Sequence, residues 1–286
     1  MHRDGWHLTE DIDDFLGRAG PFLRARPDLH TMALTVTETL RTQGAAAYGG
    51  RAPLLGYLVE SGEVRAAFHR RTPGLLSPTP LTPRQAGALA ARLAGPGHVL
   101  AGVGAEQHTA AAFAEAWRRA TGATPVPRAQ RVRLYRLAAP TPPEPPPEGR
   151  ARAAGARDHG RVVRWCRAFT AEVGEDFPAD DAAWPGTRFA AKRFTFWETP
   201  DGTPVSLAGA TPMTAGHVRV DPVYTPAGLR GRGYAGAVTA AVSRAALAAG
   251  ARVVVLFADP ANPTSTALYQ RIGYVPVAEF TVYDFS

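Results

Sequence analysis

The sequence of 286 residues contains very little cysteine. Cys166 is the only one, which excludes an internal disulfide framework and a metal cluster built on cysteine thiolates. No apolar run approaches the roughly 18 residues of a membrane-spanning helix, so no membrane anchor is expected. The N-terminal residues lead into an acidic stretch at 10–14, which is not the pattern of a signal peptide. These absences predict a cytoplasmic protein without a bound metal.

Lysine is equally scarce, and arginine carries almost all of the positive charge. The chain has 31 arginines, one lysine (Lys192) and a net charge of +7. Residues 1–140 hold most of the excess, with 17 arginines against 11 acidic residues. Residues 118–136 hold six arginines and no acid. We interpret this segment as a solvated face beside a strand edge protected by charge. No zinc-finger spacing, helix-turn-helix signal or aromatic-interleaved basic ribbon indicates nucleic-acid binding.

A proline-rich segment divides the chain almost in half. Residues 140–148 read Pro-Thr-Pro-Pro-Glu-Pro-Pro-Pro-Glu, which favours an extended spacer and excludes a helix or a central strand. We therefore predict a first domain at 1–139, a linker at 140–148 and a second domain at 149–286.

The first half has the predicted order helix, helix, strand, strand, helix, strand, helix, strand, and the second half repeats that order with a third strand before its long helix. In the first half these lie at 12–16, 29–40, 54–60, 64–70, 83–93, 99–103, 106–120 and 130–137. In the second half they lie at 158–173, 180–188, 194–198, 205–209, then a strand at 218–225, a helix ending at 249, a strand at 252–258, a helix at 264–272 and a strand at 277–283. The repetition indicates an internal duplication, although the two sequences barely resemble each other.

A glycine-rich loop opens the long helix of the second half. Residues 230–236 read Arg-Gly-Arg-Gly-Tyr-Ala-Gly. The backbone N–H groups of such a loop have no helical partner and lie at the positive end of the helix dipole, which favours a pyrophosphate. The three glycines also satisfy the dinucleotide motif Gly-x-Gly-x-x-Gly. However, that motif turns tightly off its strand, whereas residues 224–229 intervene here, and the preceding order is rich in hairpins. Glycines in a purely structural helix-start turn are the remaining alternative.

The same region resembles motif A of the GNAT superfamily, the acyl-CoA-dependent N-acetyltransferases. The motif reads Arg/Gln-x-x-Gly-x-Gly/Ala and is met by Arg230, Gly233 and Ala235. Further along the chain, Asn262, Tyr269 and the pair at 273–274 are similar to the second signature of the family. Two motifs in the right order, with a buried strand between them, are far more specific than either alone.

The resemblance covers residues 150–286. The first half shares only the order of elements, because residues 81–88 stand where motif A would fall and contain no glycine loop. The first half therefore looks like a degenerate copy.

The resemblance implies acetyl-CoA as the co-substrate. Backbone N–H groups from Arg230 to Gly236 would cradle the pyrophosphate, and the glycines let the backbone approach without a Cβ clash. In the family, the strand before the loop splays from its neighbour, and pantetheine pairs with the backbone groups in the gap. The residues expected to bind the co-substrate are Val223, Tyr224, Thr225, Arg230, Gly231, Arg232, Gly233, Tyr234, Ala235, Gly236, Asn262 and Ser265.

Acetyl transfer to an amine requires one group that takes a proton from the amine and one that protonates the leaving thiolate. Tyr269 matches the acid of the family, and a phenol is protonated at neutral pH; core packing is the alternative role for this side chain. Arg219 stands at the position of the family's base and cannot serve as one. Asp221 lies on the same face of that strand and is the candidate base, with Glu198 on a neighbouring strand as a second. Deprotonation relayed by water, without a dedicated base, is a further alternative.

These observations predict an α/β (α+β) protein of two GNAT-like domains, each a twisted mixed sheet flanked by helices. The second domain is expected to transfer the acetyl group directly, since Cys166 lies on the apolar stripe of a helix and is suited to packing. The expected acceptor is a small-molecule amine, a preference that follows from the breadth of the family. Two alternatives remain: a non-catalytic acyl-CoA-binding or regulatory module, and an arginine-rich nucleic-acid binder.

Overall fold

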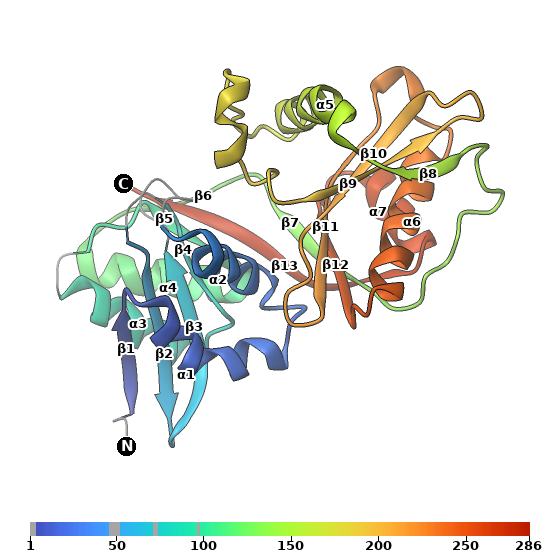
Figure 1. The fold of residues 1–286 in the computed structure, drawn as a ribbon. Helices are drawn as coiled ribbons and strands as arrows, with labels where there is room; N and C mark the ends of the chain where they lie inside the picture. Colours follow the sequence, from blue (N-terminus) through green and yellow to red (C-terminus); the bar gives the residue numbers. More distant parts are fainter. Residues whose placement is uncertain (1–3, 46–51, 71–73, 96–97) are drawn as a thin grey trace. The chain divides into compact units, whose positions relative to one another are not determined.

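The structure is a computed structural model that describes residues 4–45, 52–70, 74–95 and 98–286 (Figure 1). The chain forms two compact units. The first consists of Met1–Leu134, Asp259–Ala261 and Val277–Ser286, and the second of Tyr135–Ala258 and Asn262–Pro276. The C-terminal residues thus belong to the first unit, and the domain boundary at 140–148 stays a prediction. Among the described residues, no helix combines the length and apolar character needed to cross a membrane.

The first unit is a sheet with helices on both faces. Its strand order is β1-β2-β3-β4-β5-β13, and β6 also pairs with β13. Its elements are β1 (Gly5–Thr9), α1 (Ile12–Ala25), α2 (Thr31–Gln43), β2 (Leu54–Glu60), β3 (Glu63–Arg70), β4 (Leu76–Pro78), α3 (Pro83–Ala94), β5 (Gly102–Glu106), α4 (Gln107–Thr121), β6 (Pro125–Pro127) and β13 (Tyr274–Phe285). Helices α1 and α2 share a core with Leu55 and Tyr57, whereas α3 and α4 share one with Leu58 and Phe68. Because side chains alternate along a strand, the two helix pairs cover opposite faces.

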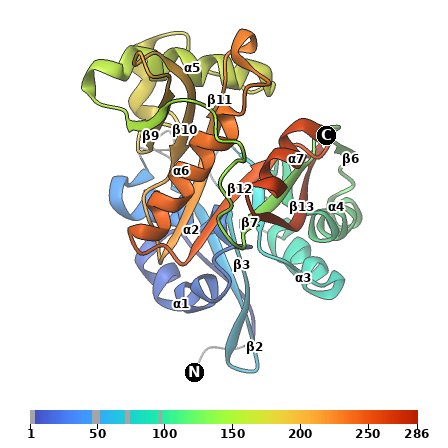
Figure 2. The same cartoon turned by 90° about the vertical axis from the view of Figure 1, so that its right-hand side faces the viewer.

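The second unit has the strand order β7-β12-β11-β10-β9-β8. Its elements are β7 (Val132–Leu137), β8 (Arg150–Ala153), η2 (Ala156–Asp158), α5 (His159–Glu172), η3 (Asp181–Gly186), β9 (Arg193–Glu198), β10 (Pro204–Ala210), β11 (His217–Tyr224), η4 (Ala227–Leu229), α6 (Tyr234–Ala248), β12 (Val253–Ala258) and α7 (Pro263–Arg271). Helix α6 packs against β10, β11 and β12, as Figures 1 and 2 both show.

The alternation along β11 separates a packing face from a polar face. Val218 and Val220 lie in one core with Val238 and Val242 of α6. The intervening residues of β11, at 217, 219 and 221, are polar and point to the other face. Helix α5 packs on that other face, since its Val162 and Cys166 share a core with β9 and β10. The sheet thus buries β11 between α6 and α5, with its polar side chains on the α5 side.

Most elements lie where the sequence predicts them, and the differences have local causes. Helix α6 and strand β12 match their predicted ranges closely. The helix predicted at 180–188 is wrong, because the structure has only the 3-10 turn η3, which contains Pro185 and ends at Gly186. The sequence did not predict β1 and β8, which lie at the edges of the sheet. Strand β8 reads Arg-Ala-Arg-Ala and lies at a sheet edge, so it has no apolar alternation.

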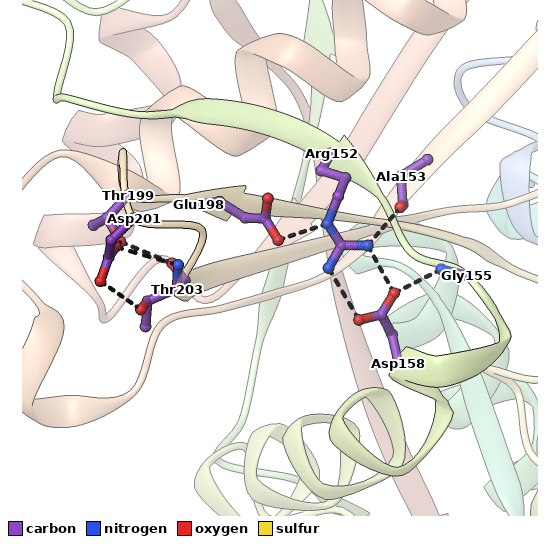
Figure 3. Close-up of polar contacts among 8 residues, drawn as sticks. All are labelled: Arg152, Ala153, Gly155, Asp158, Glu198, Thr199, Asp201 and Thr203. Carbon is purple, nitrogen blue, oxygen red and sulfur yellow. Dashed lines mark hydrogen bonds and ion pairs between the residues drawn. The ribbon is translucent and has the colours of Figure 1, made fainter.

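An ion-paired cluster fixes β8 to the start of α5 (Figure 3). The Arg152 guanidinium donates through Nη1 and Nη2 to the Asp158 carboxylate at 2.7 and 3.0 Å, and through Nε to Glu198 at 2.5 Å. Asp158 also accepts the Gly155 N–H at 2.8 Å. The bonds from Arg152, followed by the one from Gly155, lower the pKa of Asp158 to about 2. The carboxylates of Asp158 and Glu198 are both buried, so their negative charges depend on the positive charge of Arg152.

We expect Arg152→Met to destabilise the second unit by about 2–3 kcal/mol, since it leaves two buried carboxylates without their cation. In the wild type, the contribution of Asp158 is fully present above about pH 4 and is lost as the pH falls through about 2, because its folded-state pKa is lowered. Urea unfolding followed by circular dichroism at pH 7 measures the change. Arg150→Met, on the exposed part of the same strand, is the matched control. Equal midpoints for the two variants would contradict the prediction.

Candidate active site

The glycine-rich loop connects β11 to α6. Gly231 and Gly233 have φ values of 78° and 79°, a region that side chains with a Cβ rarely adopt. A Cβ at Gly231 would meet no atom within 4 Å, so backbone conformation, not crowding, requires glycine there. Gly233 is the N-cap residue of α6 in this left-handed conformation.

The first turn of α6 presents N–H groups without an intramolecular acceptor. No side chain caps this helix, and its first turn contains no acidic residue. The N–H of Ala237 donates to Gly233 O at 3.1 Å. Within the described residues, no acceptor is found for the preceding N–H groups, at 234–236. These donors, together with the helix dipole, form a site that favours an anion.

The strand pairing opens beside this loop. Strand β11 pairs in parallel with β12 from His217 to Val220, where Val220 faces Leu256. In the described register, residues 221–224 continue as strand but pair only with β10, through Val223 and Tyr224. The pairing of β11 with β12 thus ends at Val220, before the residues that the family resemblance assigns to pantetheine. A bulge between Ala208 and Ala210 of β10 lies opposite the point of separation.

Arg230 holds the loop in place through its side chain. Its Nε donates to the carbonyl of Thr225 at 2.9 Å, and its Nη2 contacts both oxygens of Glu172 at 2.5 and 2.7 Å. Arg232 Nη2 reaches Gly228 O at 3.5 Å. The sequence analysis includes both arginines among the residues that bind the co-substrate, but the Arg230 side chain is bonded to Glu172 of α5, so the loop's backbone supplies the clearer donors.

Four other residues predicted to bind the co-substrate lie at the end of β11 and at the start of α7. The Thr225 hydroxyl lies 2.8 Å from Ser206 Oγ, and the Ser206 hydroxyl donates to the Tyr224 carbonyl at 3.1 Å. Asn262 caps α7, because its Oδ1 accepts the Ser265 N–H at 3.0 Å. These contacts fix the end of β11 and the start of α7.

Tyr269 lies on α7 and is 9% exposed. Its ring lies 6.4 Å from Tyr135 and 6.2 Å from Tyr274, measured between ring centroids. Burial raises the pKa of its phenol, and the charges of Tyr274 and Asp221 add to the shift. The phenol is therefore protonated throughout the neutral range, as an acid must be.

Asp221 lies just beyond the last β11 residue that pairs with β12. Lys192 Nζ and Arg188 Nη1 both donate to its Oδ2, the latter at 2.5 Å. Burial alone would raise the pKa of Asp221, but the charges of Lys192, Arg188 and Arg219 outweigh it and hold this pKa well below its usual range. A carboxylate with so low a pKa is a weak proton acceptor when its cations are charged. The ion pairs thus weigh against Asp221 acting alone as the base, a role that stays a prediction.

The other two groups considered in the sequence are engaged elsewhere. Glu198 is bound by Arg152 and is 4% exposed, so this candidate base is part of the structural cluster in Figure 3. Cys166 is fully buried, and burial raises the pKa of its thiol to about 12. A thiol with so high a pKa is a poor nucleophile.

We expect the native protein to resist alkylation at Cys166. Iodoacetamide at pH 8 should leave the folded chain unmodified, whereas the urea-unfolded chain should gain one adduct, because only the unfolded thiol approaches its ordinary pKa. Mass spectrometry of the intact protein measures both. Rapid labelling of the native chain would contradict the buried position.

Arginines of the segment 118–136 form ion pairs with acidic residues outside the segment. Arg118 and Arg119 pair with Glu115, at 2.9 and 3.7 Å. Arg128 pairs with Asp284 of β13 at 2.7 Å. Arg133 pairs with Glu279, also of β13. These pairings weaken the nucleic-acid alternative, which depended on a segment without acids.

Comparison with known proteins now gives the class of this site. Residues 152–274 match the acetyltransferase (GNAT) family. This range contains the loop, the strand separation and Tyr269. The C-terminal part of the chain is therefore a GNAT acetyltransferase domain, as the two sequence motifs predict. No curated protein matches the sequence.

Solved structures share the fold over nearly the whole chain. A Drosophila protein is 15% identical with a TM-score of 0.63, and the alignment covers 99% of each chain. A GNAT-family acetyltransferase from Colwellia psychrerythraea is 10% identical, with a TM-score of 0.58, covering 98% of this chain and 99% of that one. A tandem GNAT protein from the clavulanic acid biosynthesis pathway is 14% identical with a TM-score of 0.57, covering 98% of each chain. The predicted α/β fold with two GNAT-like domains is confirmed.

The structure also reveals site residues that the sequence reasoning missed. Glu172 holds Arg230, and both Arg188 and Lys192 hold Asp221. One signal was present in the sequence, since Lys192 is the only lysine among 32 basic residues.

Proposed function

We propose that the chain is a cytoplasmic N-acetyltransferase that moves the acetyl group of acetyl-CoA directly to a primary amine of a small molecule. The observation that carries the proposal is the combination of uncapped N–H groups at the start of α6 with the separation of β11 from β12. Each feature meets a different part of the same co-substrate. The N–H groups suit the pyrophosphate, and the unpaired edge of β11 suits the amide groups of pantetheine.

The proposed reaction requires no covalent enzyme intermediate. The amine loses one proton, attacks the thioester carbonyl and forms the amide as the carbon–sulfur bond breaks. A backbone N–H at the end of β11, near Val223 and Tyr224, would stabilise the oxyanion. Tyr269 would protonate the leaving thiolate, and its raised pKa keeps that proton in place until the thiolate forms. The buried thiol of Cys166 takes no part.

Two measurements test the proposal. Calorimetry with CoA and with acetyl-CoA should show binding of both. CoA release should then be followed against a panel of primary amines that includes polyamines, aromatic amines, amino acids and an aminoglycoside, with mass spectrometry of the acetylated product. If neither CoA nor acetyl-CoA gives a heat of binding, the proposal is refuted. Binding without turnover across the panel would favour the non-catalytic acyl-CoA-binding alternative.

A further inference from the structure

Lys192 is the single lysine of a chain that otherwise uses arginine. All other ion pairs found between side chains in the described residues have arginine as the cation. Arginine stays charged at any physiological pH, whereas a buried lysine can release its proton. Arginine would serve in a purely structural ion pair here as it does elsewhere in the chain. The use of lysine therefore indicates a side chain that exchanges a proton.

The position of Lys192 connects it to the predicted catalytic groups. Its side chain is 3% exposed, and Nζ donates to Asp221. Asp221 is 18% exposed and lies one residue beyond the pairing of β11 with β12. The charge of Asp221 in turn acts on the phenol of Tyr269. The carboxylate is thus bonded to the lysine and is partly open at the end of the β11–β12 pairing.

The groups around Lys192 set its proton affinity. Burial is the largest influence and lowers the pKa of Lys192 to about 8; Asp221 opposes this shift, and the positive charges of Arg188 and Arg219 add to it. Arg188 comes from the segment before β9, Arg219 from β11, and Cys166 from α5 is uncharged. Arg188 also pairs with Glu175 at 2.7 Å, which links it to the segment that follows α5. A base is most effective when its pKa lies near the working pH.

We propose that Asp221 and Lys192 together form the general base, with Asp221 receiving the acceptor's ammonium group and Lys192 taking its proton. The inference rests on the proposed acetyl transfer and assigns the proton that this transfer must remove. Asp221 alone contacts the acceptor, and the buried lysine acts through it.

The two protons of the transfer are accounted for, and one of them is released to solvent in each turnover. Before reaction the pair is a carboxylate beside a neutral amine. The acceptor R–NH₃⁺ hydrogen-bonds to Asp221, one proton passes by way of that carboxylate to Lys192 Nζ, and R–NH₂ and Lys192–NH₃⁺ result. As the carbon–sulfur bond breaks, Tyr269 protonates the leaving thiolate, and the positively charged nitrogen of the tetrahedral intermediate releases a second proton that restores the phenol. Lys192 then loses its proton to solvent.

One direct test uses the fact that lysine occurs once. Protein labelled with ¹³C at lysine Cε gives a single Cε signal, which can be titrated in the intact chain. We expect a midpoint near pH 8, and a lower midpoint in Asp221→Asn because the opposing negative charge is gone. A wild-type midpoint at the ordinary value of about 10.4 would overturn the proposal.

The second test is kinetic and uses the amine with the highest turnover in the panel. We expect kcat of the wild type to rise with pH through about 8 and then level off. Lys192→Met should lower kcat at pH 8 by about 10²-fold and abolish that rise, with acetyl-CoA binding unchanged. Lys192→Arg keeps the charge but cannot release the proton, so it should remain as slow. Arg193→Met removes the neighbouring exposed cation and is the control.

The outcomes separate the two proposals. If Lys192→Arg or Lys192→Met keeps wild-type kcat and pH dependence, the proton route is wrong while acetyl transfer stands. If the wild type neither binds acetyl-CoA nor acetylates any amine, the proposed function itself fails. If Lys192→Arg does not fold, the Cε titration of the wild type and the kinetics of Lys192→Met test the proton route.

Discussion

Replacing Tyr269 with phenylalanine is expected to lower kcat by about 10²- to 10⁴-fold while the dissociation constant of acetyl-CoA stays unchanged. The change removes one hydroxyl for which the structure shows no hydrogen bond to another described residue, so the fold should tolerate it. The ring contacts with Tyr135 and Tyr274 remain, because they depend on the aromatic ring alone. Without the phenol the thiolate must leave unprotonated or take its proton from water, which slows the chemical step. Stopped-flow or steady-state measurement of CoA release, with calorimetry for binding, separates the two quantities.

Tyr274→Phe is the matched control for this experiment. Its hydroxyl lies 2.7 Å from Ser243 Oγ inside the core, so its loss should cost about 1 kcal/mol of stability and little turnover. If Tyr269→Phe retains full activity, Tyr269 is a packing residue, and the acid must be another group or water.

The second large effect is expected for Ala235→Asp, in the first turn of α6. A carboxylate there favours the helix dipole, so the thermal midpoint should stay the same or rise slightly. The same charge lies beside the N–H groups proposed to hold the pyrophosphate. Repulsion between such charges a few ångströms apart, at an effective dielectric between that of protein and water, amounts to roughly 1–4 kcal/mol per charge pair. The dissociation constant of CoA should therefore rise by about 10²-fold or more, as calorimetry can measure.

Ala235→Asn is the neutral control of nearly the same size. It should bind CoA much more tightly than Ala235→Asp, and the difference should shrink at high salt because ions screen exposed charges. Equal CoA affinity in the aspartate variant and the wild type would mean that the pyrophosphate does not lie at this helix end.

The parts of the fold that follow local rules could be predicted from the sequence. The glycines at 231 and 233 indicate positive φ, and α6 and β12 carry their own periodicity. Strand β8 could not be predicted, since an exposed edge strand needs no apolar alternation. The pairing of β13 with β5 was also beyond local pattern, because a strand does not reveal which sheet it joins.

The candidate site divides in the same way. The two motifs gave the loop and Tyr269, because each is a continuous stretch of chain. The partners of Asp221 and Arg230 were missed, as Lys192 is 29 residues from Asp221 and Glu172 is 58 from Arg230. Long-range ion pairs are set by tertiary packing, and no spacing rule links their members. The composition gave one indication, because Lys192 is the single lysine of the chain. Its contact with Asp221 is visible only in the folded structure.

The position of β13 has a consequence for how the protein is made. Residues 280–284 pair with 102–106 at the edge of β5, so the first unit completes its sheet with residues that follow the second unit in the chain. During translation the edge of β5 stays open for most of the time that the ribosome needs to make the second half. An exposed edge can pair with another chain. Nascent chains should thus depend on shielding at this edge until β13 has been synthesised, and a fragment cut at the proline-rich segment would carry the same open edge permanently.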